Sequence, residues 1–122
     1  MRKLLVAVVL LVASLGAAAP ARAEGDEARD RAACAGGSAR LRVEAEDGRL
    51  HVELRLDARP GVRTFRVVLL HERTLVVSGL RRTTAAGTFR VRLTLPDWPG
   101  RETVSARLVP PSGRACLLSV TL

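Results

Sequence analysis

Hydrophobic and polar residues alternate with a period of two through most of the chain after residue 40. In residues 50–57, leucine and valine occupy every second position, and polar or charged residues occupy the positions between them. Successive side chains of a β-strand point to opposite faces, so this alternation predicts strands with one buried face. The pattern predicts seven short strands, at residues 41–46, 50–57, 65–70, 75–77, 89–95, 104–108 and 116–122. With no helical period between them, they predict an all-β fold, a seven-stranded antiparallel β-sandwich or small barrel.

Turn signals separate these stretches. Asp47-Gly48 is the strongest short signal for a hairpin, and Arg59-Pro60-Gly61 is typical of a turn. A tight connection is expected at residues 71–73 and a polar loop at residues 79–87. Apolar residues occupy both faces of residues 65–70, which indicates a central or doubly covered strand. The inward positions in the second half of the chain are predicted to be Phe65, Val67, Leu69, Phe89, Val91, Leu93, Val104, Ala106 and Leu108.

The chain begins with the three parts of a secretory signal. Arg2 and Lys3 precede an apolar run from Leu4 to Leu15, and Ala21-Arg22-Ala23 is a small-x-small cleavage site. The run is too short to span a ~30 Å hydrocarbon core comfortably. We therefore expect residues 1–23 to be a signal peptide and the mature protein to have no membrane span. Residues 24–37, which are charged and rich in alanine and glycine, are predicted to be a tether before a domain at residues 38–122.

Cys34 and Cys116 are the only cysteines. An even count in an exported protein indicates a disulfide, because the compartment is oxidising. This bridge would tie the N-terminal and C-terminal regions of the domain together. A metal site or a catalytic thiol is the alternative, but neither cysteine has further ligands or a base at a recognisable spacing.

Residues 95–104, which read LPDWPGRETV, resemble the segment that leads into the sixth strand of fibronectin type III modules. The chain from about residue 38 onward is similar to an immunoglobulin-like or fibronectin type III-like sandwich. The resemblance implies that the first and last strands run side by side and parallel, which would bring Cys34 near Cys116. The chain departs from the family in two ways: Thr103 stands where those modules usually carry tyrosine, and Trp98 lies in a corner rather than on a strand.

Arginine is the distinctive chemical resource of the chain. Arg2, Lys3 and Arg22 leave with the signal, so the mature chain keeps 17 basic and 12 acidic groups, all of the basic ones arginine. A coding bias toward GC-rich codons is the simplest reason for this usage. The best candidate for binding polyanions is the segment that carries Arg81, Arg82, Arg90 and Arg92 with no acidic residue between them. The alternative is that these charges only keep exposed strands from aggregating.

Signals for catalysis or metal binding are weak. His51 and His71 are the only histidines, and a metal site would need Glu53 or Glu72 in addition. Ser78, His71 and Asp97 supply the residue types of a hydrolytic triad, but no nucleophile motif accompanies them. Trp98 is either an exposed anchor for a ligand or, as we favour, a corner residue that caps the core. With few aromatic residues beside the arginines, nucleic acid is not expected as a partner.

These features predict a secreted or extracytoplasmic module that is not an enzyme and has no cofactor or metal. It would act by binding, or as a structural component of the cell envelope or extracellular space, with a protein or a polyanionic envelope polymer as possible partners. Arginine-mediated binding of polyanionic envelope polymers is the first alternative. A small hydrolase or metal carrier is the second.

Overall fold

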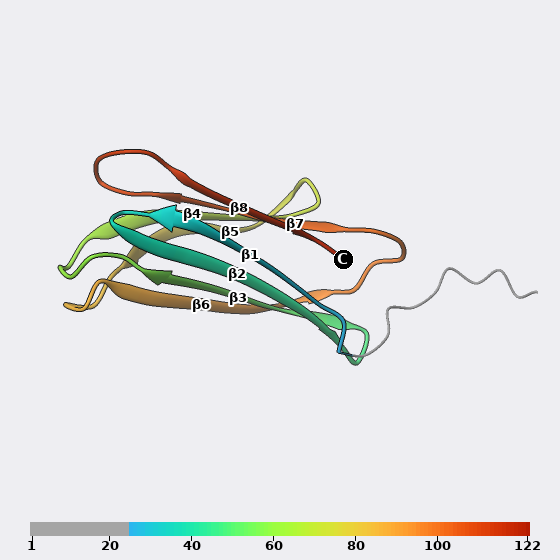
Figure 1. Ribbon diagram of the computed structural model, residues 1–122. Coiled ribbons are helices and arrows are strands. Elements are labelled where there is room, and N and C mark those ends of the chain that lie inside the picture. Colours follow the sequence, from blue (N-terminus) through green and yellow to red (C-terminus); the bar gives the residue numbers. More distant parts are fainter. Residues whose placement is uncertain (1–24) are drawn as a thin grey trace, which may run out of the picture.

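The computed structural model describes residues 25–122, which form eight strands in two antiparallel four-stranded sheets (Figure 1). Sheet A has the order β1-β2-β3-β6, and sheet B has the order β5-β4-β7-β8. The strands are β1 (Glu27–Cys34), β2 (Gly37–Glu46), β3 (Arg49–Asp57), β4 (Thr64–His71), β5 (Thr74–Arg82), β6 (Thr88–Pro96), β7 (Thr103–Val109) and β8 (Cys116–Thr121). The all-β class is confirmed, and all seven predicted strands are present. The predicted signal peptide lies outside the described residues.

Strand β1 is the eighth strand, and it corrects the prediction of a tether at residues 24–37. It pairs along its whole length with β2. Its inward positions are small or polar: Ala28 and Ala32 pack against the core, and Asp30 accepts a hydrogen bond from the Ser119 backbone N–H at 2.9 Å. Alanine and aspartate give no apolar alternation, so the strand left no signal in the sequence.

A second correction concerns the loop predicted at residues 79–87. Strand β5 continues to Arg82, with Arg81 opposite Phe65 and Arg82 opposite Thr64 on β4. The strand extends because its partner is still extended there, although its own residues are polar. The connection to β6 is correspondingly shorter.

The predicted hairpins form where the turn residues demand them. Asp47 and Gly48 join β2 to β3 with φ angles of 52° and 72°, as a type I′ turn requires. Residues 72 and 73 form the tight connection between β4 and β5. Strand β4 is central in sheet B, as its apolar sequence predicts.

The core lies between the two sheets. Phe65, Val67 and Leu69 on β4 are fully buried, and leucine and valine of β2 and β3 cover them from sheet A. Phe89 meets Phe65 edge to face, with ring centroids 5.8 Å apart. Phe89 and Leu93 are half-buried because β6 is an edge strand, whereas the other predicted inward residues are buried.

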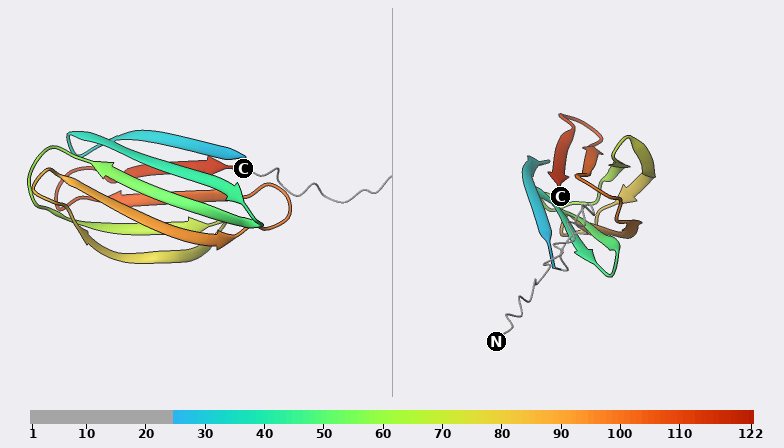
Figure 2. Two further views of the ribbon diagram at one scale, coloured as in Figure 1. Left: turned by 90° about the horizontal axis from the view of Figure 1, so that it is seen from below. Right: turned by 90° about the vertical axis from the view of Figure 1, so that its right-hand side faces the viewer.

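A disulfide joins Cys34, at the end of β1, to Cys116, at the start of β8. Strands β1 and β8 lie beside each other at one side of the sandwich, and β5 and β6 lie at the other side (Figure 2). This corrects the parallel arrangement that the resemblance implied. The strand beside β8 is β1, and the two run in opposite directions, because Cys34 ends β1 whereas Cys116 begins β8. Among residues 25–122, no helix is long and apolar enough to cross a membrane.

Candidate functional site

The pairing of sheet A lines up arginines from all four of its strands. Arg31 on β1 lies opposite Arg40 on β2, Arg40 lies opposite Arg55 on β3, and Arg55 lies opposite Arg90 on β6. All four positions belong to the outward phase of their strands. We call this line of four the arginine row. It crosses the sheet at right angles to the strands.

A second line runs beside the first, two residues along each strand. It consists of Arg29, Arg42, Glu53 and Arg92, which are opposite one another in the same strand order. We call the two lines together the arginine band. The band brings seven arginines and one acidic residue onto one face of the sandwich.

Ion pairs neutralise the band unevenly. The Glu53 carboxylate is shared by Arg92, whose Nε lies 3.2 Å from Oε2, and by Arg90, whose Nε lies 3.5 Å from Oε1. Arg55 pairs with Asp57 at 3.0 Å. Among residues 25–122, Arg40 makes no ion pair, and the guanidinium group of Arg31 donates only to the Ser38 hydroxyl, at 3.5 Å. The β1–β2 end of the arginine row therefore carries uncompensated positive charge.

Acidic residues border the band at its β1–β2 end. Glu27 and Glu44 are opposite each other, two residues from Arg29 and Arg42, and Glu44 forms an ion pair with Arg42 at 2.9 Å. Arg42 donates from Nε to Glu27 Oε1 at 2.7 Å, and Arg29 pairs with the same oxygen. These two arginines lower the pKa of Glu27 to about 2, mainly through the hydrogen bond from Arg42. Glu27 is therefore ionised at any ordinary pH and marks the edge of the band.

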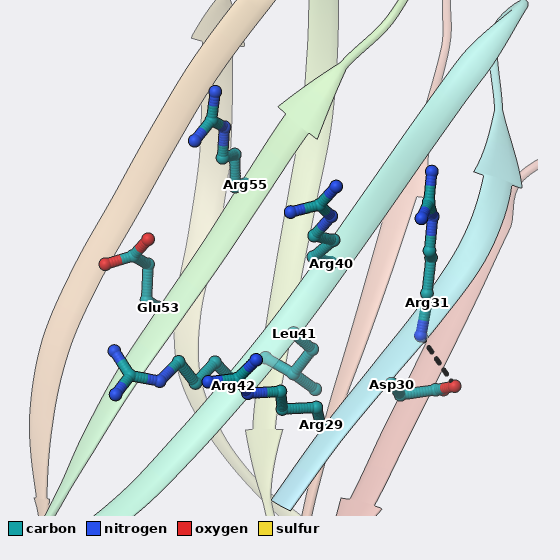
Figure 3. A pocket seen from close by; sticks show the side chains of 8 residues that line it. All are labelled: Arg29, Asp30, Arg31, Arg40, Leu41, Arg42, Glu53 and Arg55. Atoms are coloured by element: carbon teal, nitrogen blue, oxygen red, sulfur yellow. Dashed lines mark hydrogen bonds between the residues drawn. The ribbon is translucent and has the colours of Figure 1, made fainter.

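A shallow furrow of about 700 Å³ runs over β1, β2 and β3 within the band. Figure 3 shows Arg31, Arg40 and Arg55 on these neighbouring strands, with their guanidinium groups turned toward the same end of the sheet. Like charges directly opposite each other on a sheet are destabilising. An anion in the furrow would relieve this repulsion and accept charge-assisted hydrogen bonds from several guanidinium groups.

The structure separates the four arginines singled out in the sequence. Arg90 and Arg92 belong to the band, on sheet A. Arg81 and Arg82 are on β5 of sheet B, and adjacent positions of a strand point to opposite faces. Five further arginines, from β1, β2 and β3, share the band with Arg90 and Arg92. They are Arg29, Arg31, Arg40, Arg42 and Arg55. These arginines come from three strands and are separated in the sequence by apolar, small or acidic residues, so only the pairing reveals the cluster.

His71 belongs to a buried polar corner between the sheets. Its Nε2 lies 3.4 Å from Oε1 of Glu102, and both side chains are almost inaccessible. Trp98 stacks on the imidazole ring, with centroids 3.8 Å apart and planes 10° from parallel, and its backbone N–H donates to Glu102 Oε2 at 2.9 Å. Trp98 itself remains 39% exposed. It therefore covers this polar pair rather than the apolar core.

The sequence carried a signal for this corner. His71 continues the inward phase of Phe65, Val67 and Leu69, and Glu102 stands two positions before inward Val104. Burial raises the pKa of Glu102, because the ionised carboxylate loses its hydration, and nearby His71 counteracts this only in part.

The remaining candidates do not come together. Ser78 is an exposed residue of β5, whereas His71 is buried beneath Trp98. His51 is exposed on β3, and its nearest acidic partner is Glu46 at 3.9 Å. Across residues 25–122, no three His, Cys, Asp or Glu side chains are grouped so that they could hold a metal ion.

Comparison with protein-family models, with curated proteins and with solved structures gave no match for this chain. Its function must therefore be inferred from its own residues.

Proposed function

We propose that this protein is a non-enzymatic binding module of the cell envelope or extracellular space, and that it binds polyanionic polymers through the arginine band. The observation that carries the proposal is the arginine row, in which four strands each place an arginine opposite the next. Such an arrangement costs stability in the free protein. A surface that only needed solubility would be better served by alternating signs of charge.

The finer architecture is proposed to be that of an immunoglobulin-like sandwich. The order of β2, β3 and β6 in one sheet and of β5, β4, β7 and β8 in the other matches strands A, B, E and C′, C, F, G of that architecture. In this assignment β1 is an additional strand beside the first. Its addition widens sheet A by one strand and supplies two arginines of the band.

An exported location is supported by the disulfide, since such bonds persist in oxidising compartments. Envelope and extracellular matrices contain anionic polymers, so the location and the surface agree. Neither line of the band contains an aromatic residue. Bases would have nothing to stack on, which favours a polymer recognised through its charges over a single-stranded nucleic acid.

The test is retention on immobilised heparin, measured against salt with the mature chain. We expect retention at low salt that falls steeply as salt rises, because each contact releases a condensed counterion. Replacing the arginine row (R31Q, R40Q, R55Q and R90Q together) should abolish retention near physiological salt. The matched control replaces four exposed arginines outside the band: Arg66, Arg101, Arg107 and Arg114.

The control removes the same net charge but leaves the band intact, so it should retain most of the binding. A third variant, R81Q with R82Q, measures the contribution of β5 and should be nearly neutral. Absence of retention at low salt, or equal loss in the row variant and the control, would overturn the proposal. Circular dichroism and melting curves establish that each variant is folded.

A further inference from the structure

We propose that the polymer bound by the arginine band is a linear chain with a phosphate or sulfate group on each repeat, and that it lies across the strands along the arginine row. This inference rests on the proposed function and adds the class and the direction of the ligand. The direction follows from how charge is distributed over the face.

Charge is continuous in one direction only. Across the strands, the row presents Arg31, Arg40, Arg55 and Arg90 without interruption. Along each strand, an acidic or uncharged residue interrupts the positive charge after one or two arginines. On β1 the next outward position beyond Arg29 is Glu27, and on β2 the next beyond Arg42 is Glu44.

The other two strands behave in the same way. On β3, Arg55 lies between Glu53 and Asp57 in the outward phase, and on β6 the outward position beyond Arg92 is the uncharged Thr94. A polyanion parallel to β1, β2 or β3 would meet a carboxylate after one or two arginines. A polyanion that crosses the strands meets four arginines, which span ~14 Å at the ~4.8 Å spacing of neighbouring strands.

The chemical class follows from the group of four arginines on β1 and β2. Arg29 lies opposite Arg42, and Arg31 lies opposite Arg40. Their Cα positions form a cell of ~5 Å across the strands by ~7 Å along them. A sulfate ester or phosphate monoester has three terminal oxygens on one tetrahedral centre, so it can accept from arginines on both strands at once. A phosphate within a chain has two terminal oxygens, but its centre is tetrahedral and further oxygens bridge to the next repeat. A carboxylate has two oxygens in a single plane.

Glu53 shows what a carboxylate does on this face. Its two oxygens lie next to Arg92 and Arg90, and so it already occupies the anion position between β3 and β6. A bound polymer must compete with it there. Glu53 is therefore expected to weaken binding at the β6 end. Within the β1–β2 cell, Glu27 already engages Arg29 and Arg42, and Glu44 also engages Arg42. The strongest subsite is therefore expected at Arg31 and Arg40, which make no ion pair with any residue in the range 25–122.

The experiment measures the affinity of the whole mature chain for polyphosphate and for heparin oligosaccharides of graded length, at several salt concentrations. Orthophosphate and sulfate serve as single-group probes, and polyglutamate serves as the carboxylate probe. We expect affinity to rise with length until the chain spans the four strands. Polyphosphate and heparin should both bind far more tightly than polyglutamate of equal charge, and the stronger of the two identifies the source of the oxyanion.

Two double variants test the direction. R31Q with R90Q removes the two ends of the row, and R40Q with R42Q removes both arginines of β2. For a ligand that crosses the strands, the end variant should reduce the salt slope of a long oligomer by about half, since two of four contacts are lost. The same variant should change the binding of a long oligomer much more than that of a dimer.

Glu53→Gln provides a gain-of-function arm. It should raise affinity for long oligomers, whereas Glu72→Gln, on the turn between β4 and β5, should not. If long oligomers bind but R31Q with R90Q leaves their affinity unchanged while R40Q with R42Q abolishes it, the ligand runs along the strands and this inference is wrong. Equal affinity for polyglutamate would overturn the chemical class. Failure of every polyanion to bind would instead overturn the proposed function.

Discussion

The Glu102 carboxylate is buried, and burial disfavours its ionised form. One oxygen accepts the Trp98 backbone N–H, and the other faces His71 Nε2 without a well-aligned hydrogen bond. The backbone of Glu102 also pairs in both directions with Leu122, at 3.0 Å each way. The paired main chain therefore fixes the position of the Glu102 side chain. Burying its carboxylate lowers the free energy of unfolding, because the ionised group loses its hydration.

Glu102 should make stability depend on pH. Its pKa is raised in the folded protein above the ordinary 4.5, so the folded state binds this proton more tightly than the unfolded state does. Its contribution to stability is full below pH 4.5 and declines as the pH rises through the raised pKa. Glu102→Gln keeps an oxygen for the Trp98 N–H and cannot ionise, so it should remove this decline. Urea midpoints measured from pH 4.5 to 8 test this.

Glu27→Gln is the informative comparison, because its effect has the opposite sign. The pKa of Glu27 is lowered to about 2, so its ion pairs stabilise the protein above pH 4.5 and are lost as the pH falls toward 2. Glu27→Gln should therefore change how the urea midpoint depends on pH below 4.5. Above pH 4.5 the slope of the midpoint against pH should stay as in the wild type. A slope above pH 4.5 that survives in Glu102→Gln would show that another group is responsible.

Strand β1 shows how one element can be held with little apolar packing. Its inward side chains are two alanines, an aspartate and a cysteine. What fixes the strand is its pairing with β2, the Asp30 bond to the Ser119 N–H, and the disulfide from Cys34 to β8. Since the first two are polar and exposed to competition from water, the covalent link carries a large share of its anchoring.

Removing the disulfide should lower the free energy of unfolding. The bond closes a loop with a sequence separation of 82, which is worth about 4 to 5 kcal/mol in the chain-entropy model. Urea denaturation of the oxidised protein, with and without a reducing agent, measures this. The double variant C34S with C116S should match the reduced protein and should not respond to the reductant. An unchanged midpoint on reduction would contradict the expectation.

The elements show where prediction from sequence succeeds and where it stops. Strands β2, β3 and β7 alternate apolar with polar residues, and β4 is apolar on both faces as a central strand is expected to be, so burial and local pattern agree. Strand β1 buries alanine, which has no such signature. The arginine row could not be foreseen, because it depends on the register between strands as far apart in sequence as Arg31 and Arg90. The prediction of a connection at residues 71–73 was wrong for His71, which ends β4, and the burial of Glu102 was not predicted, although both residues continue the inward phase of the neighbouring strand.

At the scale of the molecule, the two outer faces differ in chemistry. Sheet A presents the arginine band. Sheet B presents a furrow of about 510 Å³ lined largely by apolar side chains, among them Val68, Leu70 and Leu117. Sheet A does not hold the larger net charge, because its strands carry eight arginines but also six acidic residues, whereas the strands of sheet B carry four arginines and no acidic residue. What distinguishes sheet A is that its arginines lie side by side, so we expect a polyanion to be held there by close contacts with the arginine row rather than by long-range steering of the whole domain.

The position of the disulfide has a consequence for the whole surface. The strand that it anchors supplies Arg29 and Arg31, half of the four-arginine cell, so the thiol state of Cys34 and the capture of polymer are thermodynamically linked. In a reducing medium β1 should fray first, and the affinity for polyphosphate should fall toward that of R29Q with R31Q while the rest of the sandwich stays folded. Amide exchange in β1, followed together with affinity, measures this. Equal affinity of the oxidised and reduced forms would show that pairing with β2 alone holds the strand. If both the proposed function and this link hold, full affinity for the polymer requires prior oxidation of Cys34 and Cys116, as an oxidising compartment would provide.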